Sequence, residues 1–323
     1  MIVVTGGAGF IGSALVHALN RRGHTDICIV DVEDHPEKNN NLAPLKYLSL
    51  VSPEPFLEQV LAGSLPGVDT LFHLGACSST TETDIEFLDR NNFQFTRHLA
   101  QYCLDQDIRF IYASSAATYG DGRQGYSDDV SQLETLKPLN PYGQSKQDFD
   151  VWARQEGVLG RMVGLKYFNV FGPNEYHKED MRSMVLKGYE QIRDTGKIRL
   201  FKSYKPEYGD GEQVRDFIYV QDAVAMTLFF QDHPEINGLF NVGSGEARCW
   251  NDLARAIFGA LNREPVIEYI EMPESIRDQY QYHTCAKTDK IRNAGYDRPT
   301  LSLEDAVNDY VNHYLIPGKH LIP

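Results

Sequence analysis

The fold is decided near the amino terminus, by the stretch Ile2-Val3-Val4-Thr5-Gly6-Gly7-Ala8-Gly9-Phe10-Ile11-Gly12. Its apolar start predicts a buried strand, and the pattern over Phe10–Arg22 predicts a helix directly after the glycines. Glycines in this position allow a tight turn, the approach of backbone to a diphosphate, and close packing of the helix on the strand. The free N–H groups of a helix start favour an anion there. The stretch therefore predicts a dinucleotide-binding loop, with contacts from Gly6, Gly9, Phe10, Ile11 and Gly12.

Four further apolar runs repeat the strand pattern along the first half of the chain. They are Ile27–Asp31, Thr70–Leu74, Arg109–Ala113 and Val163–Phe168. Runs of Val, Ile, Phe and Leu without alternation are typical of parallel strands that are covered on both faces. Helical patterns lie between these runs, so the sequence predicts an α/β fold with a doubly wound parallel sheet, the Rossmann arrangement.

The pattern loosens after about Gly172, where prolines and glycine-containing turns interrupt shorter elements. We therefore predict a dinucleotide-binding Rossmann domain over residues 1–172 and a smaller C-terminal α/β lobe that binds substrate over most of residues 173–323. Later segments such as 214–245 are expected to return to the first domain.

Composition excludes several classes of function. The formal net charge is −14, whereas binding to nucleic acid or to an anionic membrane needs clustered Lys and Arg. The five cysteines contain no CxxC pair, so the sequence predicts neither a metal site nor a disulfide framework. The chain starts with neither a basic segment nor a long apolar one, and we expect a cytoplasmic protein.

An acidic residue closes the second predicted strand. Asp31 lies at roughly the twenty-residue offset at which a carboxylate accepts the hydroxyls of a cofactor ribose. Asp31 favours NAD, because a carboxylate repels the 2′-phosphate of NADP. Lys38, and with it Lys46, offers a cation in the following segment that would instead accommodate this phosphate. The residues themselves leave NAD and NADP both open, with contacts from Asp31, Val32 and Lys38 in either case.

The acid/base candidate is Tyr142, in the stretch Tyr142-Gly143-Gln144-Ser145-Lys146. Asn140 and Pro141 precede it and are good residues for a helix start, so Tyr142 and Lys146 are expected one turn apart on one face. A phenol with a pKa of about 10 is a poor base at neutral pH, and a nearby ammonium favours its ionised form. Ser115, at the carboxyl end of a predicted strand, is placed to bind the same substrate oxygen.

These residues resemble the extended short-chain dehydrogenase/reductase family, nearly from end to end. The markers are the TGGAGFIG loop, the turn at His73–Cys77, the Ser114–Gly120 and Tyr142–Lys146 motifs, Tyr167–Pro173, Arg215–Val220 and Phe240–Gly245. Members mostly act on nucleotide sugars as epimerases, dehydratases or reductases. The resemblance therefore implies an isomerase or oxidoreductase with a nicotinamide cofactor, a nucleotide-diphosphate sugar as substrate, and a homo-oligomer.

Within this family the chain is most similar to the epimerases that invert C6 of an ADP-activated heptose. The similarity rests on Gly75–Glu82, on the intact Ser114–Gly120 motif and on His177-Lys178. It implies a tightly held NADP, with NAD as the alternative, and transient oxidation and re-reduction at C6. Tyr142 would serve one face of the transient ketone and Lys178 the other.

The resemblance also assigns contacts that spacing alone does not. The cofactor contacts would be Leu74, Gly75, Ala76, Cys77, Ser78, Asn91, Lys146 and Val170. The substrate contacts would be Ser115, Asn169, Lys178, Asp180, Lys187, Phe201, Arg215 and Tyr280. Leu74, Asp180 and Lys187 depart from the residues usual at these positions in the C6 epimerases.

Two other functions remain open from the sequence. A nucleotide-sugar 4-epimerase would share the glycine loop, Ser115, Tyr142 and Lys146, but it has less use for a second base such as Lys178. A dehydratase is disfavoured because Ala116-Ala117 stand where an Asp-Glu pair is usual. An NAD(P)-sensing binding protein would need the loop but none of the catalytic residues.

Overall fold

Seven parallel strands form the central sheet of the protein, whose computed structural model describes residues 1–277 and 280–322. Their order is β10-β6-β5-β4-β1-β2-β3. The bounds are β1 Ile2–Thr5, β2 Ile27–Val30, β3 Ser49–Val51, β4 Thr70–His73, β5 Arg109–Ser115, β6 Val163–Tyr167 and β10 Gly238–Val242. The predicted doubly wound parallel sheet is confirmed.

The strand ends differ slightly from the prediction. β2, β4 and β6 each end one residue earlier than predicted, and β5 continues two residues further, to Ser115. This extension arises because Ser114 and Ser115 stay paired with Lys166 and Tyr167 of β6. Ser115 is therefore the last residue of a strand and lies at the carboxyl edge of the sheet, where ligands of such folds bind. The short edge strand β3 lacks an apolar run long enough for sequence to reveal it.

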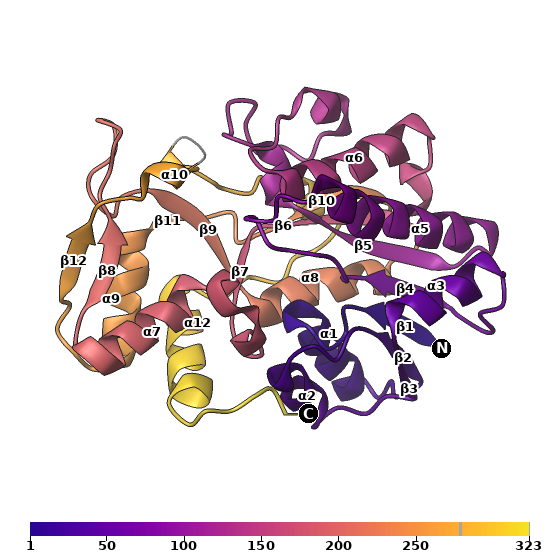
Figure 1. Cartoon of the computed structure of the whole chain (residues 1–323), viewed down its shortest axis with the longest axis horizontal. Coiled ribbons are helices and arrows are strands. Elements are labelled where there is room, and N and C mark those ends of the chain that lie inside the picture. Colours follow the sequence, from indigo (N-terminus) through magenta and orange to yellow (C-terminus); the bar gives the residue numbers. More distant parts are fainter. Residues whose placement is uncertain (278–279, 323) are drawn as a thin grey trace.

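Helices cover both faces of this sheet (Figure 1). One face packs against α1 (Phe10–Arg21), α8 (Val220–Asp232) and α11 (Asp289–Asn293). The other packs against α3 (Pro53–Leu61), α5 (Phe95–Asp105) and α6 (Pro141–Gln155). Successive strand residues such as Val3 and Val4 are both fully buried, one in each of these two cores. This two-sided burial is why the strands read as continuous apolar runs.

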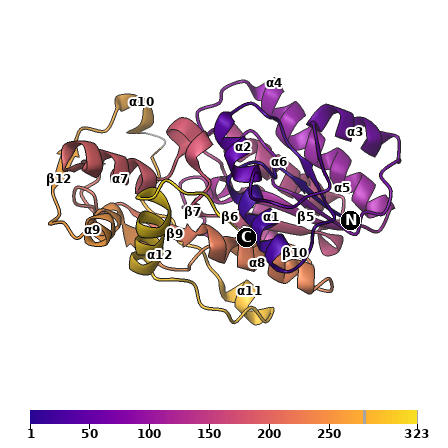
Figure 2. The ribbon, with the colours of Figure 1, turned by 90° about the horizontal axis from the view of Figure 1, so that it is seen from below.

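A smaller group of elements lies beside the sheet, at the other end of the molecule's long axis (Figures 1 and 2). It contains a three-stranded sheet, β7 (Asn169–Phe171), β9 (Val214–Tyr219) and β11 (Ala247–Cys249), and the pair β8 (Ile198–Phe201) and β12 (Ile267–Ile270). Around them lie α7 (Met184–Thr195), α9 (Trp250–Ala260), α10 (Glu274–Arg277) and α12 (Leu303–Tyr310). A third core joins α7, α9 and α12.

The segment 214–245 is shared between the two groups of elements. Its strand β10 pairs with β6 in the main sheet, and its helix α8 packs on α1, whereas β9 belongs to the three-stranded sheet. The division of the chain at residue 172 stays a prediction.

Short helices complete the described chain. They are α2 (Pro36–Leu42), α4 (Ile85–Leu88), the π-helices η1 (Asp89–Gln94) and η6 (Val311–Leu315), and the 3₁₀ helices η2 (Ala116–Tyr119), η3 (Val130–Thr135), η4 (Leu159–Arg161) and η5 (Tyr176–Met181). Across residues 1–277 and 280–322, no helix combines the length and the apolar character needed to cross a membrane.

Candidate active site

The glycines of the loop between β1 and α1 have different surroundings. Gly6 has φ +68°, and a Cβ there would lie 2.6 Å from the backbone nitrogen of Gly75. A Cβ at Gly12 would overlap the carbonyl oxygen of Gly6. At Gly9 the neighbours are the Gly6 carbonyl oxygen at 3.1 Å and His177 Nε2 at 4.0 Å, and no side chain caps α1. Gly6 and Gly12 are thus needed for packing, while Gly9 leaves the helix start open to an anionic ligand.

This difference predicts separable effects for two substitutions. Gly9→Val is expected to fold normally, because Gly9 has an extended conformation (φ −73°) that valine adopts readily. It is also expected to lose nicotinamide dinucleotide binding by at least about 10-fold, since the isopropyl group would lie where the diphosphate approaches. Gly12→Val is expected to prevent folding. Circular dichroism and isothermal titration with the cofactor measure the two effects. Unchanged cofactor affinity in a folded Gly9→Val protein would refute the loop assignment.

Asp31 connects the glycine loop to the segment after β2. Its carboxylate accepts hydrogen bonds from the backbone N–H groups of Ala8 (2.9 Å) and Val32 (2.8 Å). Lys38 Nζ lies 3.1 Å from the same carboxylate and 2.7 Å from that of Asp34. Lys38 is therefore positioned at the ribose end of the loop. Lys46 is not, because it is exposed and its backbone is bonded to the Asn20 side chain, near the far end of α1.

The turn after β4, which contains Leu74–Ser78, is held by two polar side chains. The Thr5 hydroxyl accepts from Gly75 N–H at 3.1 Å. The buried amide of Asn92 accepts from Cys77 N–H (2.9 Å) and donates to its carbonyl oxygen and to the Ser145 hydroxyl (3.0 Å each). The predicted contact Asn91 is half-buried and bonds to Asn92 itself. Sequence reasoning missed Asn92, because nothing in two adjacent asparagines tells which one turns inward.

The predicted acid/base residues converge at the carboxyl edge of the sheet. Helix α6 begins at the Asn140 cap, whose side chain accepts from Gly143 N–H at 2.8 Å, with Pro141 as its first residue. Tyr142 and Lys146 follow one turn apart, and the Ser115 hydroxyl is close enough to the Tyr142 phenol to lower its pKa. The structure therefore brings together Ser115, Tyr142 and Lys146, which the sequence predicted as one group.

One electrostatic expectation is wrong for this structure. Burial raises the pKa of Tyr142, and the nearby Ser115 hydroxyl only partly opposes that effect. The Lys146 ammonium donates to the Ala113 carbonyl oxygen at 2.9 Å, and burial lowers its own pKa to about 8. A buried ammonium that is already bonded elsewhere does not offset the desolvation of the phenol. In this structure the pKa of Tyr142 is therefore shifted away from neutrality rather than towards it.

Lys178 lies in η5, next to the glycine loop. Its ammonium is 5.5 Å from the centroid of the Phe10 ring. Burial lowers the pKa of Lys178, and the nearby Glu175 carboxylate acts in the opposite direction. Glu175 is itself fixed by the hydroxyl of Ser183 at 2.6 Å. The pKa of Lys178 is thus shifted in the direction that a general acid/base at neutral pH requires.

Residues near the carboxyl end of the chain stabilise the segment before η5, the short helix that carries Lys178. The fully buried Asn41 amide donates to the carbonyl oxygens of Ala8 (3.0 Å) and Asn174 (3.1 Å) and is bonded to His320 at 2.8 Å. Leu321 N–H donates to the Asn174 side chain at 2.9 Å. His320 also lies 3.3 Å from Glu37 of α2, and Figure 1 shows the last part of the described chain, in yellow, running towards this helix. The segment that carries Lys178 is therefore tied to the glycine loop by contacts that the sequence did not indicate.

A second group of predicted residues gathers around Arg215 on β9. The buried Arg215 guanidinium lies 5.1 Å from the centroid of Tyr280 and 5.5 Å from that of Trp250. The Trp250 indole donates to the Tyr280 hydroxyl at 2.9 Å, and Phe201 meets Tyr280 edge-on at 6.3 Å. The sequence analysis missed Trp250, although a tryptophan shortly after the Phe240–Gly245 motif could have been proposed as a substrate contact.

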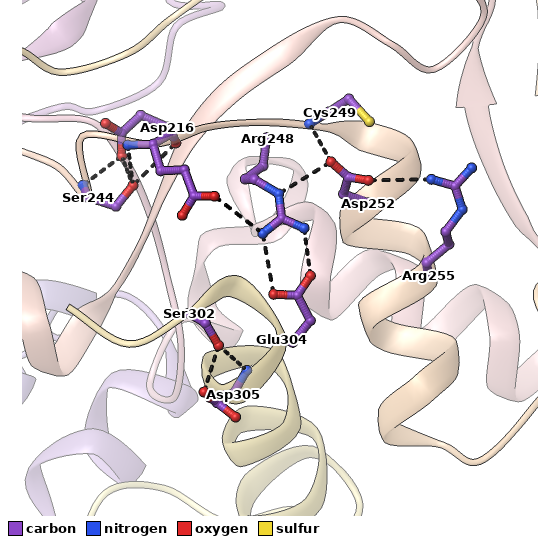
Figure 3. A network of polar contacts seen from close by, with 10 residues as sticks. Asp216, Ser244, Arg248, Cys249, Asp252, Arg255, Ser302, Glu304 and Asp305 are labelled. Carbon is purple, nitrogen blue, oxygen red and sulfur yellow. Dashed lines mark hydrogen bonds and ion pairs between the residues drawn. The ribbon is translucent and has the colours of Figure 1, made fainter.

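Arg215 keeps its charge available for a ligand. Within the described residues, Arg215 forms no ion pair. Arg248, which lies opposite Arg215 across β11 and β9, is by contrast neutralised by Asp252 (3.3 Å) and Glu304 (2.5 Å) (Figure 3). The carboxylate of the neighbouring Asp216 does not pair with Arg215 either, because it accepts a hydrogen bond from Ser244 N–H at 2.7 Å. A buried, unpaired guanidinium is suited to bind a diphosphate.

The remaining predicted contacts lie between these groups. Asn169 is exposed on β7, and Val170 next to it is half-buried. Asp180 is exposed, and its carbonyl oxygen accepts from the Lys187 ammonium. Their roles stay predictions.

Comparison with known proteins identifies the family. The pattern of the NAD-dependent epimerase/dehydratase family matches residues 2–243. The chain belongs to this family. A protein of Nitratidesulfovibrio vulgaris (strain DP4) named ADP-L-glycero-D-manno-heptose-6-epimerase is 53% identical over 316 residues, covering 98% of each chain. One of the same name from Fusobacterium nucleatum subsp. nucleatum is 46% identical over 325 residues, covering 98% of each chain.

Solved structures of the NAD-dependent epimerase/dehydratase type share the architecture. The Helicobacter pylori ADP-L-glycero-D-manno-heptose-6-epimerase superposes with a TM-score of 0.81 and 28% identity, covering 97% of this chain and 95% of that one. The Thermus thermophilus UDP-glucose 4-epimerase in complex with NAD has a TM-score of 0.73 and 22% identity, covering 97% and 98%, and shows the fold alone. Family membership supports a nicotinamide cofactor.

Proposed function

We propose that the protein is an epimerase that converts ADP-D-glycero-D-manno-heptose to ADP-L-glycero-D-manno-heptose by transient oxidation and re-reduction at C6. The observation that carries this proposal is the 53% identity, over 98% of both chains, with a protein named for this activity. The grouping of Ser115, Tyr142 and Lys146 at the sheet edge and of Lys178 at the glycine loop supports it. Both groups supply acid/base residues that an epimerase of this kind would use.

Each residue group has a part in the proposed reaction. The glycine loop and Asp31 would hold a nicotinamide dinucleotide, which would supply the hydride transfer chemistry at C6. Tyr142 would take the proton of the C6 hydroxyl as the hydride leaves, with Ser115 orienting that oxygen. Lys178 would supply the single proton needed when the hydride returns; in the reverse direction the two residues would exchange these roles. Arg215 would hold the diphosphate of the substrate. The start of α1, which no side chain caps, and the absence of a side chain at Gly9 fit the diphosphate of the dinucleotide.

We propose NADP as the preferred cofactor, with Lys38 offsetting the charge of Asp31. The Lys38 ammonium lies 3.1 Å from the Asp31 carboxylate, so a 2′-phosphate in this position would meet a cation as well as an anion. Lys38→Gln is expected to weaken NADP binding by at least about 10-fold, because a charge-assisted hydrogen bond contributes about 1.5–3 kcal/mol. NAD binding should change less than about 3-fold. Titration of cofactor-stripped protein measures both affinities.

Lys46→Gln is the matched control for Lys38→Gln, since Lys46 is exposed beside the far end of α1. It should leave both affinities unchanged. Equal losses of NAD and NADP in Lys38→Gln would assign Lys38 a structural role and remove the argument for NADP.

The decisive experiment is incubation of the purified protein with ADP-D-glycero-D-manno-heptose in deuterated water. Proton NMR should show inversion at C6 without deuterium at that carbon, because a hydride that stays on the cofactor does not exchange with solvent. UDP-glucose and UDP-N-acetylglucosamine form the second arm. Turnover at C4 of these sugars, with an inert heptose substrate, would identify a 4-epimerase instead. Binding of cofactor with no turnover of any sugar would identify a sensing protein.

A further inference from the structure

Three consecutive residues near the carboxyl end of β5 form hydrogen bonds with side chains of α6. The Tyr112 hydroxyl donates to the Asp150 carboxylate at 2.9 Å, and the Ser114 hydroxyl donates to it at 2.6 Å. The Ala113 carbonyl oxygen between them accepts from Lys146 Nζ at 2.9 Å. The next residue of the strand is Ser115, whose hydroxyl lies near the Tyr142 phenol and acts to lower its pKa. The register of β5 against α6 is therefore fixed immediately before the catalytic hydroxyl.

The Asp150 carboxylate also meets a buried cation. Lys166 on β6 lies 2.7 Å from Asp150, and both side chains are at most 1% exposed. The same ammonium donates to the Thr118 hydroxyl in η2, at 2.7 Å. Asp150 and Lys166 thus connect α6, β5, η2 and β6 on both sides of Ser115. A buried pair of this kind is weak evidence for stability, because the desolvation of both charges offsets much of their attraction.

Asp150 also acts on Lys146 electrostatically. The two residues lie one turn apart on α6, and Asp150 opposes the effect of burial on the pKa of Lys146. The other titratable groups around Lys146 are His73 of β4, which burial keeps neutral, Cys77 of the following turn, and Tyr142. Asp150 is the acidic group among them.

We propose that Asp150 is a positioning residue for the reaction, which holds the carboxyl end of β5 on α6 and so sets Ser115 and Lys146 around Tyr142. The proposal rests on the proposed function, in that Tyr142 is taken as the acid/base. Asp150 itself touches neither substrate nor cofactor. It acts through the strand and through Lys146.

Paired variants separate positioning from charge. Asp150→Leu/Lys166→Met removes both charges and the acceptors for Tyr112 and Ser114, while Asp150→Asn/Lys166→Met removes the charges and keeps a hydrogen-bonding group. The leucine pair is expected to lower kcat by about 10- to 100-fold, because small displacements of reacting groups have effects of this size. The asparagine pair should stay within about 5-fold of wild type. KM and cofactor affinity should change less than about 3-fold in both.

The pH profile gives a readout that a merely structural residue would not move. Burial lowers the pKa of Lys146 to about 8, and loss of its charge would weaken the hydrogen bond that holds the Ala113 carbonyl oxygen, so kcat is expected to fall on the alkaline side. Asp150→Asn removes an anion and should move this limb to lower pH. Lys166→Met removes the cation that is paired with Asp150 and should move the alkaline limb of the kcat profile to higher pH. If either single variant does not fold, the two double variants decide the question.

Arg109→Met is the matched control for destabilisation. Arg109 lies at the opposite end of β5, where its guanidinium donates to the carbonyl oxygens of Phe230 (2.9 Å) and Ile236 (2.7 Å). It should lower the melting temperature but leave kcat and the pH profile unchanged. The proposal would be overturned if Asp150→Leu/Lys166→Met kept the wild-type kcat. It would also be overturned if the alkaline limb of the pH profile did not move in the folded single variants. If Tyr142→Phe also retains turnover, the proposed chemistry fails; if Tyr142→Phe is inactive, only the positioning role fails.

Discussion

Tyr142→Phe is expected to slow epimerisation by at least about 10²-fold, because it removes the group that exchanges a proton with the C6 hydroxyl. The variant keeps the aromatic ring, and the phenol is half-buried at the start of α6, so folding should be unaffected. Cofactor affinity should also be unchanged, because the glycine loop and Asp31 are untouched. Turnover measured by NMR, with cofactor titration on the same preparation, tests all three statements.

Tyr167→Phe provides the control. The Tyr167 hydroxyl is also buried and is bonded to Thr227 at 2.7 Å, on the α1 and α8 side of the sheet. Its removal should destabilise the protein slightly and leave turnover intact. A loss of less than several-fold in Tyr142→Phe would show that the proton is exchanged elsewhere. Ser115 or Lys178 would then be the group to examine.

The fold was predictable because its sequence signals are local and redundant. Each strand of the first half is a continuous apolar run, and the burial of both Val3 and Val4 explains why no alternation is seen. The loop glycines, the Asn140 cap and Pro141 mark where helices begin. Tyr142 and Lys146 were placed together for the same reason, since one helical turn separates them.

The contacts between distant segments were not predictable. Asn41 joins the glycine loop, Asn174 and His320, residues separated by more than a hundred positions along the chain. No sequence pattern marks Asp150 and Lys166 as partners, and only the packed sheet shows that they are buried and paired. Such contacts depend on the tertiary arrangement, so no spacing in the sequence reports them.

The pKa of Tyr142 illustrates the same limit. Spacing suggested that Lys146 lowers this pKa, but the structure gives Lys146 another partner and buries the phenol.

Lys178→Met is expected to lower the rate of epimerisation in both directions by about 10²-fold or more. Inversion at C6 requires that hydride leaves one face and returns to the other, while the cofactor stays fixed. In the proposed reaction the sugar arm reorients between the two steps, which would move its oxygen to a second place, and we assign that place to Lys178. Lys178 is next to the glycine loop, and burial already lowers the pKa of its ammonium, which suits proton transfer near neutral pH. Methionine keeps the apolar stem against Phe10, so folding and cofactor affinity should be preserved.

Lys178→Arg distinguishes a base from an anchor. Arginine keeps the positive charge but does not give up its proton in proteins, so it replaces a binding group and not an acid/base. If Lys178 transfers a proton, the arginine variant should be as slow as the methionine variant and should retain substrate affinity. Full activity in Lys178→Arg, together with a raised KM in Lys178→Met, would make Lys178 a diphosphate anchor. Epimerisation would then depend on Tyr142 alone, and a one-base reaction with a rotating sugar, such as 4-epimerisation, would become the better account of this site.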